Sequence, residues 1–316
     1  MTLLTYLMIS IWKGAIRMNE FVVQLNNLQK QFGKKAALNN LTFDIPENSI
    51  TGLIGRNGSG KTTLMRILAG QLDITSGAAS VFNENPMDNI GVLQHLIYSY
   101  HNFEYQKNIN LRSILEAYHT LFPNFDIIFA NKLMKYFELN GKMKYNSLSQ
   151  GMASIFNFLA ALSCRCKLTM LDEPVLGMDI TVRRAAYEIL LRDYTENPRT
   201  FIISSHLFNE LETVLSDIVL IDNGEKVLQG NIDEIRNSAY RIDGEASIID
   251  SFTMDKNILD RQNGPLQSFA VIYEPLTELV QSEINKAGLA LSSIRVEDLC
   301  IYLTKQNKEE ELKCLW

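Results

Sequence analysis

The stretch GRNGSGKT at residues 55–62 constrains the fold of this chain more than any other feature. It has the spacing G-x-x-x-x-G-K-T, and it lies between an apolar run at residues 50–54, which predicts a strand, and a run at residues 63–69, which predicts a helix. The glycines let the loop turn its backbone N–H groups inward, and together with the positive end of the helix these groups form a site for phosphate oxygens. A glycine turn that matches by accident is the alternative, but the flanking strand and helix favour a nucleoside triphosphate site.

Side chains and amides of this loop have distinct expected roles. Lys61 is placed to reach the terminal phosphates, and the Thr62 hydroxyl is placed to bind Mg²⁺. The other expected nucleotide contacts lie in the loop and the first helical turn: Asn57, Gly58, Ser59, Gly60 and Thr63.

Composition limits the classes of protein to which the chain can belong. Its 316 residues suffice for one large domain or two, and its net charge of −6 does not favour a general nucleic-acid-binding protein. No apolar stretch reaches the roughly 18 residues that a membrane-spanning helix needs. The cysteines lack a zinc-binding pattern, so we expect reduced thiols. They are Cys164, Cys166, Cys300 and Cys314.

Within the segment at residues 1–17, residues 2–12 are apolar but lack the basic start and small-residue cleavage site of a secretory signal. One interpretation is an interfacial anchor that ends with Lys13 and Arg17. The other is an upstream extension, with the natural start at Met18. We favour the second because Met18 opens directly onto the first predicted strand.

Two adjacent carboxylates follow the apolar run at residues 168–171. Because the carboxyl ends of strands in open α/β sheets point into the ligand crevice, Asp172 is expected to hold Mg²⁺ and Glu173 to orient or deprotonate a water molecule. An alternative is that one of them only caps the next helix. The upstream phosphate loop favours the metal site.

Three other features are ambiguous when taken alone. Phe32 lies in a polar turn, where it either stacks on a base or is an ordinary half-buried side chain, with equal weight. The sequence SLSQG at residues 147–151 precedes an apolar helix, and it is either a second anion site or a simple helix cap. His206 follows the strand predicted at residues 200–205, near the expected γ-phosphate position.

Residues 91–145 are rich in aromatic side chains and contain helical patterns at about residues 109–121 and 126–139. This segment predicts a helical insertion between two parts of the sheet. Its aromatic side chains form either a groove for a partner or the internal packing of the insertion. The histidines lack the spacing of metal ligands and are expected at the surface or in packing. They are His95, His101 and His119.

Taken in order, these motifs resemble the ATP-binding subunits of ABC transporters over about residues 18–230. Beside the P-loop and the Asp172–Glu173 pair, further segments match the family's motifs. These are Phe32 (adenine-stacking aromatic), Gln94 (Q-loop), LSQGM at 148–152 (signature), LGMD at 176–179 (D-loop) and His206 (H-loop). The signature departs from the usual LSGGQ at Gln150 and Met152, but it keeps Ser149 and Gly151.

The resemblance implies an α/β P-loop NTPase fold with an antiparallel β subdomain and a helical subdomain at about residues 91–165. Residues 231–316 are expected to form a small α+β accessory domain. The resemblance also implies a head-to-tail dimer that binds two ATP molecules. The implied catalytic residues are Glu173 as general base, His206 and Lys61. The implied metal ligands are Thr62, Gln94 and Asp172, and the residues that contact the partner subunit's ATP are Ser149, Gly151 and Asp179.

The implied function is ATP hydrolysis with Mg²⁺, coupled to transport through a separate membrane-spanning permease subunit that docks on residues 91–145. The chain would then lie peripherally at the cytoplasmic face of the cell membrane, beside a second ATP-binding subunit that is either identical or related. The signature and the C-terminal tail resemble exporter ATPases for antimicrobial peptides or toxins, which include the YtrB-like proteins and phenol-soluble-modulin exporters.

Two other classes of protein share some of these motifs. A soluble ABC ATPase that acts on ribosomes or DNA is less favoured, because the chain has one such domain, no sustained heptads and an acidic charge, so no nucleic-acid partner is expected. A regulator that binds ATP without hydrolysis is disfavoured by the presence of both Glu173 and His206.

Overall fold

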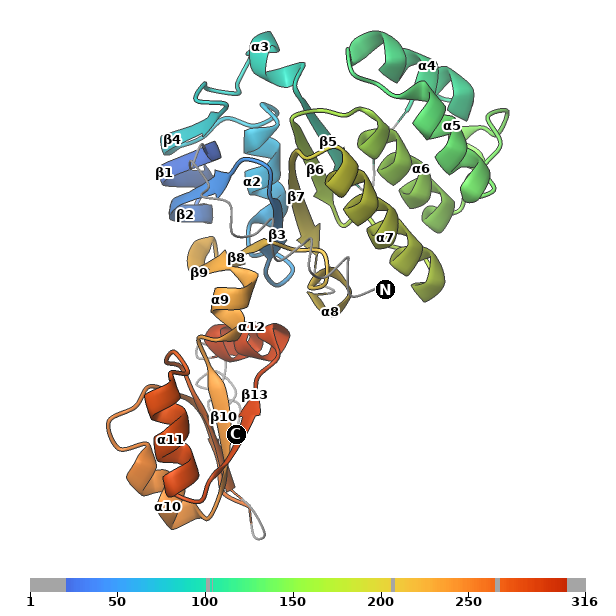
Figure 1. Cartoon of the computed structure of the whole chain (residues 1–316). Coiled ribbons are helices and arrows are strands. Elements are labelled where there is room, and N and C mark those ends of the chain that lie inside the picture. Colours follow the sequence, from blue (N-terminus) through green and yellow to red (C-terminus); the bar gives the residue numbers. More distant parts are fainter. Residues whose placement is uncertain (1–20, 101–102, 104, 206–207, 265–267, 306–316) are drawn as a thin grey trace.

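A computed structural model describes residues 21–100, 103, 105–205, 208–264 and 268–305 (Figure 1). The segment at residues 1–17, His101, His206 and Cys314 therefore lie outside the described residues. Three sheets organise the described part of the chain, with three, six and four strands. None of the helices in these ranges is long and apolar enough to cross a membrane.

The first sheet is antiparallel, with the strand order β2-β1-β4. Its strands are β1 (Phe21–Phe32), β2 (Lys35–Pro46) and β4 (Ser76–Val81). Strands β1 and β2 form a hairpin that turns at Gly33, whose φ of +58° suits a residue without a side chain. The buried side of this sheet shares one core with the six-stranded sheet, including Leu28, Leu53 and Met170.

The second sheet has the order β5-β6-β7-β3-β8-β9. Its strands are β3 (Ile50–Ile54), β5 (Leu96–Tyr100), β6 (Leu168–Asp172), β7 (Thr200–Ser205), β8 (Asp217–Asp222) and β9 (Glu225–Asn231). All neighbours pair in parallel except β8 and β9. Strands β3, β6 and β7 are buried along their whole length, which explains their continuous apolar runs.

Helices cover both faces of this sheet (Figure 1). Helix α2 (Lys61–Leu68) lies on the side of the first sheet, and α6 (Gln150–Ser163) and α7 (Ile180–Glu196) lie on the other side. Helices α4 (Leu111–Leu121) and α5 (Ile127–Tyr136) extend outward beside α6. Short helices occupy the connections: α3 (Ile90–Leu93), η1 (Tyr145–Ser147), α8 (Phe208–Leu211) and α9 (Ile232–Arg236).

The aromatic side chains between β5 and α6 pack against one another. Ring centroids lie 5.3 Å apart between Tyr100 and Phe103, 4.6 Å between Phe103 and Tyr105, and 4.4 Å between Tyr105 and Tyr145. The hydroxyls of Tyr105 and Tyr118 lie 2.8 Å apart. Of the two interpretations of these aromatics, the structure therefore favours internal packing.

The third sheet is antiparallel, with the order β11-β12-β10-β13. The elements follow as β10 (Tyr240–Gly244), α10 (Ala246–Phe252), β11 (Ile258–Gln262), β12 (Ser268–Ile272), α11 (Glu278–Lys286), β13 (Ala290–Ser293) and α12 (Val296–Lys305). The sequence β-α-β-β-α-β, with the first strand inside the sheet, is the ferredoxin-like arrangement. A core around Tyr240, Ile242 and Ile249 joins the sheet to α10 and α11.

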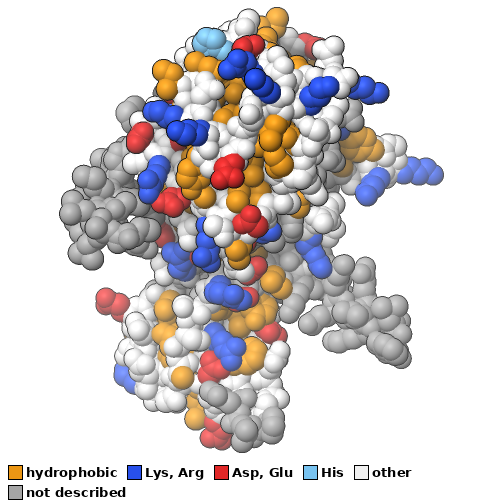
Figure 2. Space-filling view, turned by 90° about the vertical axis from the view of Figure 1, so that its right-hand side faces the viewer, with side chains coloured by type: hydrophobic (Ala, Val, Ile, Leu, Met, Phe, Trp, Pro, Cys, Tyr) orange, Lys and Arg blue, Asp and Glu red, His pale blue; other side chains and the backbone are white. Residues whose placement is uncertain are grey.

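The surface carries charges of both signs. On the face drawn in Figure 2, Lys and Arg side chains are interspersed with Asp and Glu side chains. This mixture agrees with the modest net charge of −6.

Candidate nucleotide-binding site

The loop between β3 and α2 has the backbone that its glycines predict. Gly55, Gly58 and Gly60 have φ values of +157°, +83° and +111°. A Cβ on Gly60 would lie 2.6 Å from Leu38 Cδ2 and 2.7 Å from the carbonyl oxygen of Ala37, so a side chain does not fit there. The N-cap of α2 is Gly60, which has no side chain that could cap the helix. The first amides of α2 are therefore available to an anion.

Lys61 lies against this loop. Its Nζ donates hydrogen bonds to the carbonyl oxygens of Gly55 at 2.6 Å and Arg56 at 3.0 Å. Burial lowers the pKa of Lys61, while the carboxylates of Glu173 and Asp172 act in the opposite direction. An ammonium group has three donors, so one remains for a phosphate oxygen.

Ser59 adds a second unused polar group. Its side chain is 3% exposed, and its hydroxyl has no hydrogen-bond partner among the described residues. Buried polar atoms are almost always paired in native proteins. An unpaired hydroxyl in a phosphate-binding loop is therefore suited to donate a hydrogen bond to a phosphate oxygen.

Asp172 ends β6 and accepts hydrogen bonds from three hydroxyl groups. Thr62 Oγ1 donates to Oδ2 at 2.8 Å, and Tyr98 Oη donates to the same oxygen at 3.2 Å. Ser204 Oγ donates to Oδ1. Burial raises the pKa of Tyr98, and the Asp172 carboxylate raises it further.

Thr62 and Asp172 together form a donor set that suits Mg²⁺. A hydroxyl and a carboxylate oxygen are hard ligands, and Mg²⁺ takes only one or two protein groups when phosphates and water complete its shell. Among the described residues no group of three or more His, Cys, Asp and Glu side chains could hold a metal ion. The residues present therefore fit a magnesium ion that arrives with a triphosphate.

Glu173 directly follows this carboxylate with a left-handed backbone, at φ +50°. Its amide donates to Ser204 at both Oγ, 3.1 Å away, and the carbonyl oxygen, 3.2 Å away. Positive φ is unusual for a residue with a side chain, and such strain is concentrated at functional sites. The turn keeps Glu173 half-buried at the carboxyl edge of the sheet.

Gln94 does not join this group. The parallel register pairs Leu96 with Leu168 and Tyr100 with Asp172, so β5 reaches Asp172 with its carboxyl end. Gln94 precedes β5, exposed at the C-cap of α3, and the five residues of β5 alone carry the chain about 13 Å further before it reaches Tyr100. Assigning Gln94 as a metal and nucleotide ligand was therefore wrong.

Two further expected contacts lie at the edges of the site. Phe32 ends β1 with half of its side chain exposed, under Lys30 Nζ at 5.1 Å from the ring centroid. An exposed ring of this kind is free to stack on a base. His206 directly follows β7 but lies outside the described residues.

The remaining predicted residues gather at the N-termini of α6 and α7. Ser149 is the N-cap of α6 and accepts a hydrogen bond from the amide of Met152 at 3.3 Å. Asp179 caps α7 through the amides of Thr181 and Val182, at 2.9 and 3.0 Å. Within the described part of the chain, no hydrogen bond connects Ser149 or Asp179 to the P-loop.

The signature and the D-loop are in close backbone contact. A Cβ on Gly151 would lie 2.5 Å from the carbonyl oxygen of Gly177, and a Cβ on Gly177 would lie 2.9 Å from Gln150 Cγ. Ser154 Oγ also donates to the carbonyl oxygen of Leu176 at 2.7 Å. The two segments therefore behave as one packed unit.

Sequence reasoning missed two of the side chains that hold Asp172. Ser204 is the penultimate residue of β7, and its pairing with Asp172 follows from the strand order. Tyr98 was included only among the aromatics of the insertion. Alternation along β5 would have placed Tyr98 and Tyr100 on one face, but the partner strand had first to be known.

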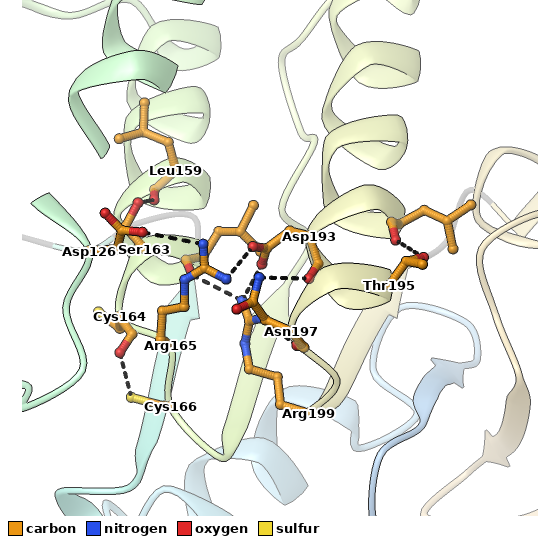
Figure 3. Close-up of polar contacts among 12 residues, drawn as sticks. Asp126, Leu159, Ser163, Cys164, Arg165, Cys166, Asp193, Thr195, Asn197 and Arg199 are labelled. Atoms are coloured by element: carbon orange, nitrogen blue, oxygen red, sulfur yellow. Dashed lines mark hydrogen bonds and ion pairs between the residues drawn. The ribbon is translucent and has the colours of Figure 1, made fainter. Parts of the chain in front are cut away.

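The opposite edge of the sheet carries a buried ion cluster (Figure 3). Asp193 of α7 lies between Arg199 Nη2, at 2.5 Å, and Arg165 Nη1, at 2.7 Å. Arg199 also donates to the carbonyl oxygen of Leu162 at 3.0 Å. These groups precede β6 and β7 and serve to join helix ends to the sheet.

The fold and the site together define a P-loop ATPase. Residues 38–176, which are less than half of the chain, match the family model described as "ABC transporter", and these residues form an ATP-binding domain of that type.

Relatives with named functions cover most of the chain. It is 25% identical over 253 residues to the ABC transporter ATP-binding protein YtrB of Bacillus subtilis, covering 80% of this chain and 85% of that protein. It is 29% identical over 235 residues to the bacitracin transport ATP-binding protein BcrA of Enterococcus faecalis, with 70% and 73% covered. It is 27% identical over 222 residues to the lantibiotic transport ATP-binding protein SrtF of Streptococcus pyogenes, with 68% and 93% covered.

Solved structures show the same fold. The ATP-binding subunit of an ABC transporter superposes with a TM-score of 0.60 at 20% identity, covering 68% of this chain and 92% of that one. A dimeric, post-hydrolysis ATP-binding cassette with bound ADP and Pi superposes with a TM-score of 0.59 at 20% identity, covering 66% and 98%.

Proposed function

We propose that this chain powers export of a peptide-like or amphipathic toxic cargo through a separate membrane-spanning subunit. The observation that carries its catalytic part is the pairing of Thr62 with Asp172 at 2.8 Å, beside Lys61 and Glu173. The cargo class is supported by the similarity to relatives named for bacitracin and lantibiotic transport.

The chemistry follows from the roles of these groups. Lys61 and the loop amides neutralise the triphosphate, while Thr62 and Asp172 hold Mg²⁺, which when bound supplies positive charge to the phosphate oxygens. Glu173 accepts the proton of the attacking water, and His206 contacts the γ-phosphate. Phe32 stacks on the adenine.

Completion of the site requires a second ATP-binding subunit. Ser149, Gly151 and Asp179 lie at the N-termini of α6 and α7, and we assign them to the ATP of the partner subunit. Closure of the dimer on ATP and its opening after hydrolysis then drive transport.

The membrane-spanning subunit is assigned to the helical region around α4 and α5. Large apolar side chains are exposed there, with Leu121, Ile128 and Tyr136 at 67%, 67% and 62%. Docking would hold the chain peripherally at the cytoplasmic face of the membrane. Recovery of a polytopic membrane protein with the natively expressed chain supports this assignment, whereas recovery of ribosomes or DNA favours the soluble class.

The variant Glu173→Gln tests the catalytic assignment. It keeps the shape of the side chain but removes the base, so it should bind ATP and accumulate as an ATP-bound dimer on gel filtration. ATP turnover should fall by about 100-fold or more. Steady-state hydrolysis equal to that of the unsubstituted protein would refute Glu173 as the base.

A further inference from the structure

We propose that Tyr98 is a positioning residue for the magnesium site, because its hydroxyl holds the Asp172 carboxylate in the orientation that the metal requires. This inference rests on the proposed role of Asp172 as a metal ligand. It assigns a role to a residue of β5 that none of the motifs above contains.

The position of Tyr98 follows from the register of the sheet. Tyr98 pairs with Met170 and Tyr100 with Asp172, so Tyr98 lies two residues before the end of β5, on the neighbouring strand. Its side chain is 6% exposed and shares a core with Met65 and Met170. Its hydroxyl donates to Asp172 Oδ2 at 3.2 Å.

Counting the lone pairs of Asp172 shows what this hydrogen bond does. A carboxylate offers about four acceptor positions. Thr62 and Tyr98 share Oδ2, and Ser204 occupies Oδ1, so three protein hydroxyls leave about one position for the metal or its water. The three donors come from α2, β5 and β7, and they restrain the carboxylate from three directions.

The ring of Tyr98 is itself held in place. Its ring centroid lies 5.1 Å from that of Tyr100. Tyr100 in turn packs on Phe103, and Phe103 packs on Tyr105, so a row of contacting rings runs toward the helical region. The hydroxyl is therefore presented by a packed side chain. Partners of this kind, one step removed from the metal, commonly change metal affinity by 10- to 100-fold.

The test compares Tyr98→Phe with Tyr100→Phe. Both substitutions remove one hydroxyl and keep the ring, but the Tyr100 hydroxyl makes no hydrogen bond to a described residue, which makes it a matched control. The primary measurement is the affinity for a fluorescent ATP analogue, with Mg²⁺ and with EDTA. A Mg²⁺ titration of ATP hydrolysis is the second readout.

Mg²⁺ should raise the affinity for the ATP analogue about 10-fold less in Tyr98→Phe than in the unsubstituted protein. The affinity measured in EDTA should be unchanged. Half-maximal hydrolysis should require correspondingly more Mg²⁺, while Tyr100→Phe should match the unsubstituted protein. A merely structural role would lower binding equally with and without Mg²⁺, and that result overturns the proposal.

Failure of this inference can be told from failure of the proposed function. If the unsubstituted protein gains affinity with Mg²⁺ and hydrolyses ATP, but Tyr98→Phe has the same Mg²⁺ dependence, then only the role of Tyr98 is refuted. If the unsubstituted protein shows neither Mg²⁺-dependent binding nor hydrolysis, the role of Asp172 as a metal ligand fails, and the inference fails with it.

Discussion

Arg183 forms an ion pair of 3.2 Å with Glu210, and its Nε donates a 2.8 Å hydrogen bond to the carbonyl oxygen of Met178. Met178 belongs to the D-loop, and Glu210 lies in α8, four residues after His206. One guanidinium group thus connects the D-loop to the helix that follows the H-loop. Both side chains are about one-quarter exposed, so the ion pair contributes about 1 kcal/mol or less to stability.

Removing this connection should affect turnover more than binding. We expect Arg183→Ala to lower ATP hydrolysis about 3- to 10-fold with little change in the dissociation constant for ATP, because the P-loop is untouched. Arg184→Ala is the matched control, since Arg184 is the exposed neighbour on the same helix. Glu210→Ala should lower ATP hydrolysis less in the Arg183→Ala background than in the unsubstituted protein, because its partner is already absent. Fully additive effects would contradict the connection.

The ion cluster of Asp193 should be important for stability (Figure 3). Asp193→Asn leaves Arg199 buried without its counter-charge, and we expect a loss of about 3–5 kcal/mol in the free energy of unfolding. Glu188→Gln breaks an ion pair with Arg192 in which both side chains are more than 60% exposed, so it should cost under about 0.5 kcal/mol. Urea denaturation followed by circular dichroism measures both, and equal losses would speak against a structural role for the cluster.

Contact between the signature and the D-loop predicts a strong effect of one methyl group. Gly151→Ala places a Cβ 2.5 Å from the Gly177 carbonyl oxygen, so the two segments must separate at a cost of about 1–3 kcal/mol. ATP binding by the single subunit should survive, while the ATP-dependent dimer should be lost on gel filtration. Gly230→Ala is the control, because its Cβ would lie 3.6 Å from Ile235, an ordinary contact. Normal dimerisation of Gly151→Ala would argue against a shared unit.

The described cysteines should resist thiol reagents in the folded protein. Cys164, Cys166 and Cys300 are all buried, and burial raises the pKa of Cys300 to about 12 and that of Cys164 well above its usual value. The thiolate is the reactive form, so at pH 8 the thiols of Cys164 and Cys300 should be protonated and inert, while burial alone shields Cys166 from the reagent. In a Cys314→Ser background we expect no rapid reaction with a chromogenic disulfide reagent. Three thiols should appear after denaturation, and fast labelling in the native state would contradict the burial.

Local motifs were predicted well because they depend on neighbouring residues. The P-loop needs only one strand, one loop and one helix, and the structure has these at Ile50–Ile54 and Lys61–Leu68. The carboxylates at the end of β6 followed from one apolar run. The helical patterns at about residues 109–121 and 126–139 correspond to α4 and α5.

Features that depend on strand pairing could not be predicted in this way. Val92 lies in a short apolar segment just before the strand at Leu96–Tyr100. The motif match took this first segment as the one that leads into the Q-loop, but it folds as the single helical turn α3, with Asn89 as its N-cap. As a result, the Q-loop was assigned to Gln94, which lies before β5 instead of after it. Strands β10 and β11 were also missed, because their sequences YRIDG and ILDRQ contain no continuous apolar run and they gain their stability from the strands beside them.

The strand order of the C-terminal four-stranded sheet has a consequence for the order in which the two parts of the chain can fold. Tyr240–Gly244 is the first of its strands in the chain but lies inside the sheet, and Ala290–Ser293 is the last and lies at an edge. A chain emerging from the ribosome therefore cannot complete this sheet until residue 293 has been made. The six-stranded sheet, by contrast, has all its strands once Asn231 is present. The nucleotide site can thus form during synthesis, and the last helix then packs near Ile232 and Ile235 on a surface that already exists.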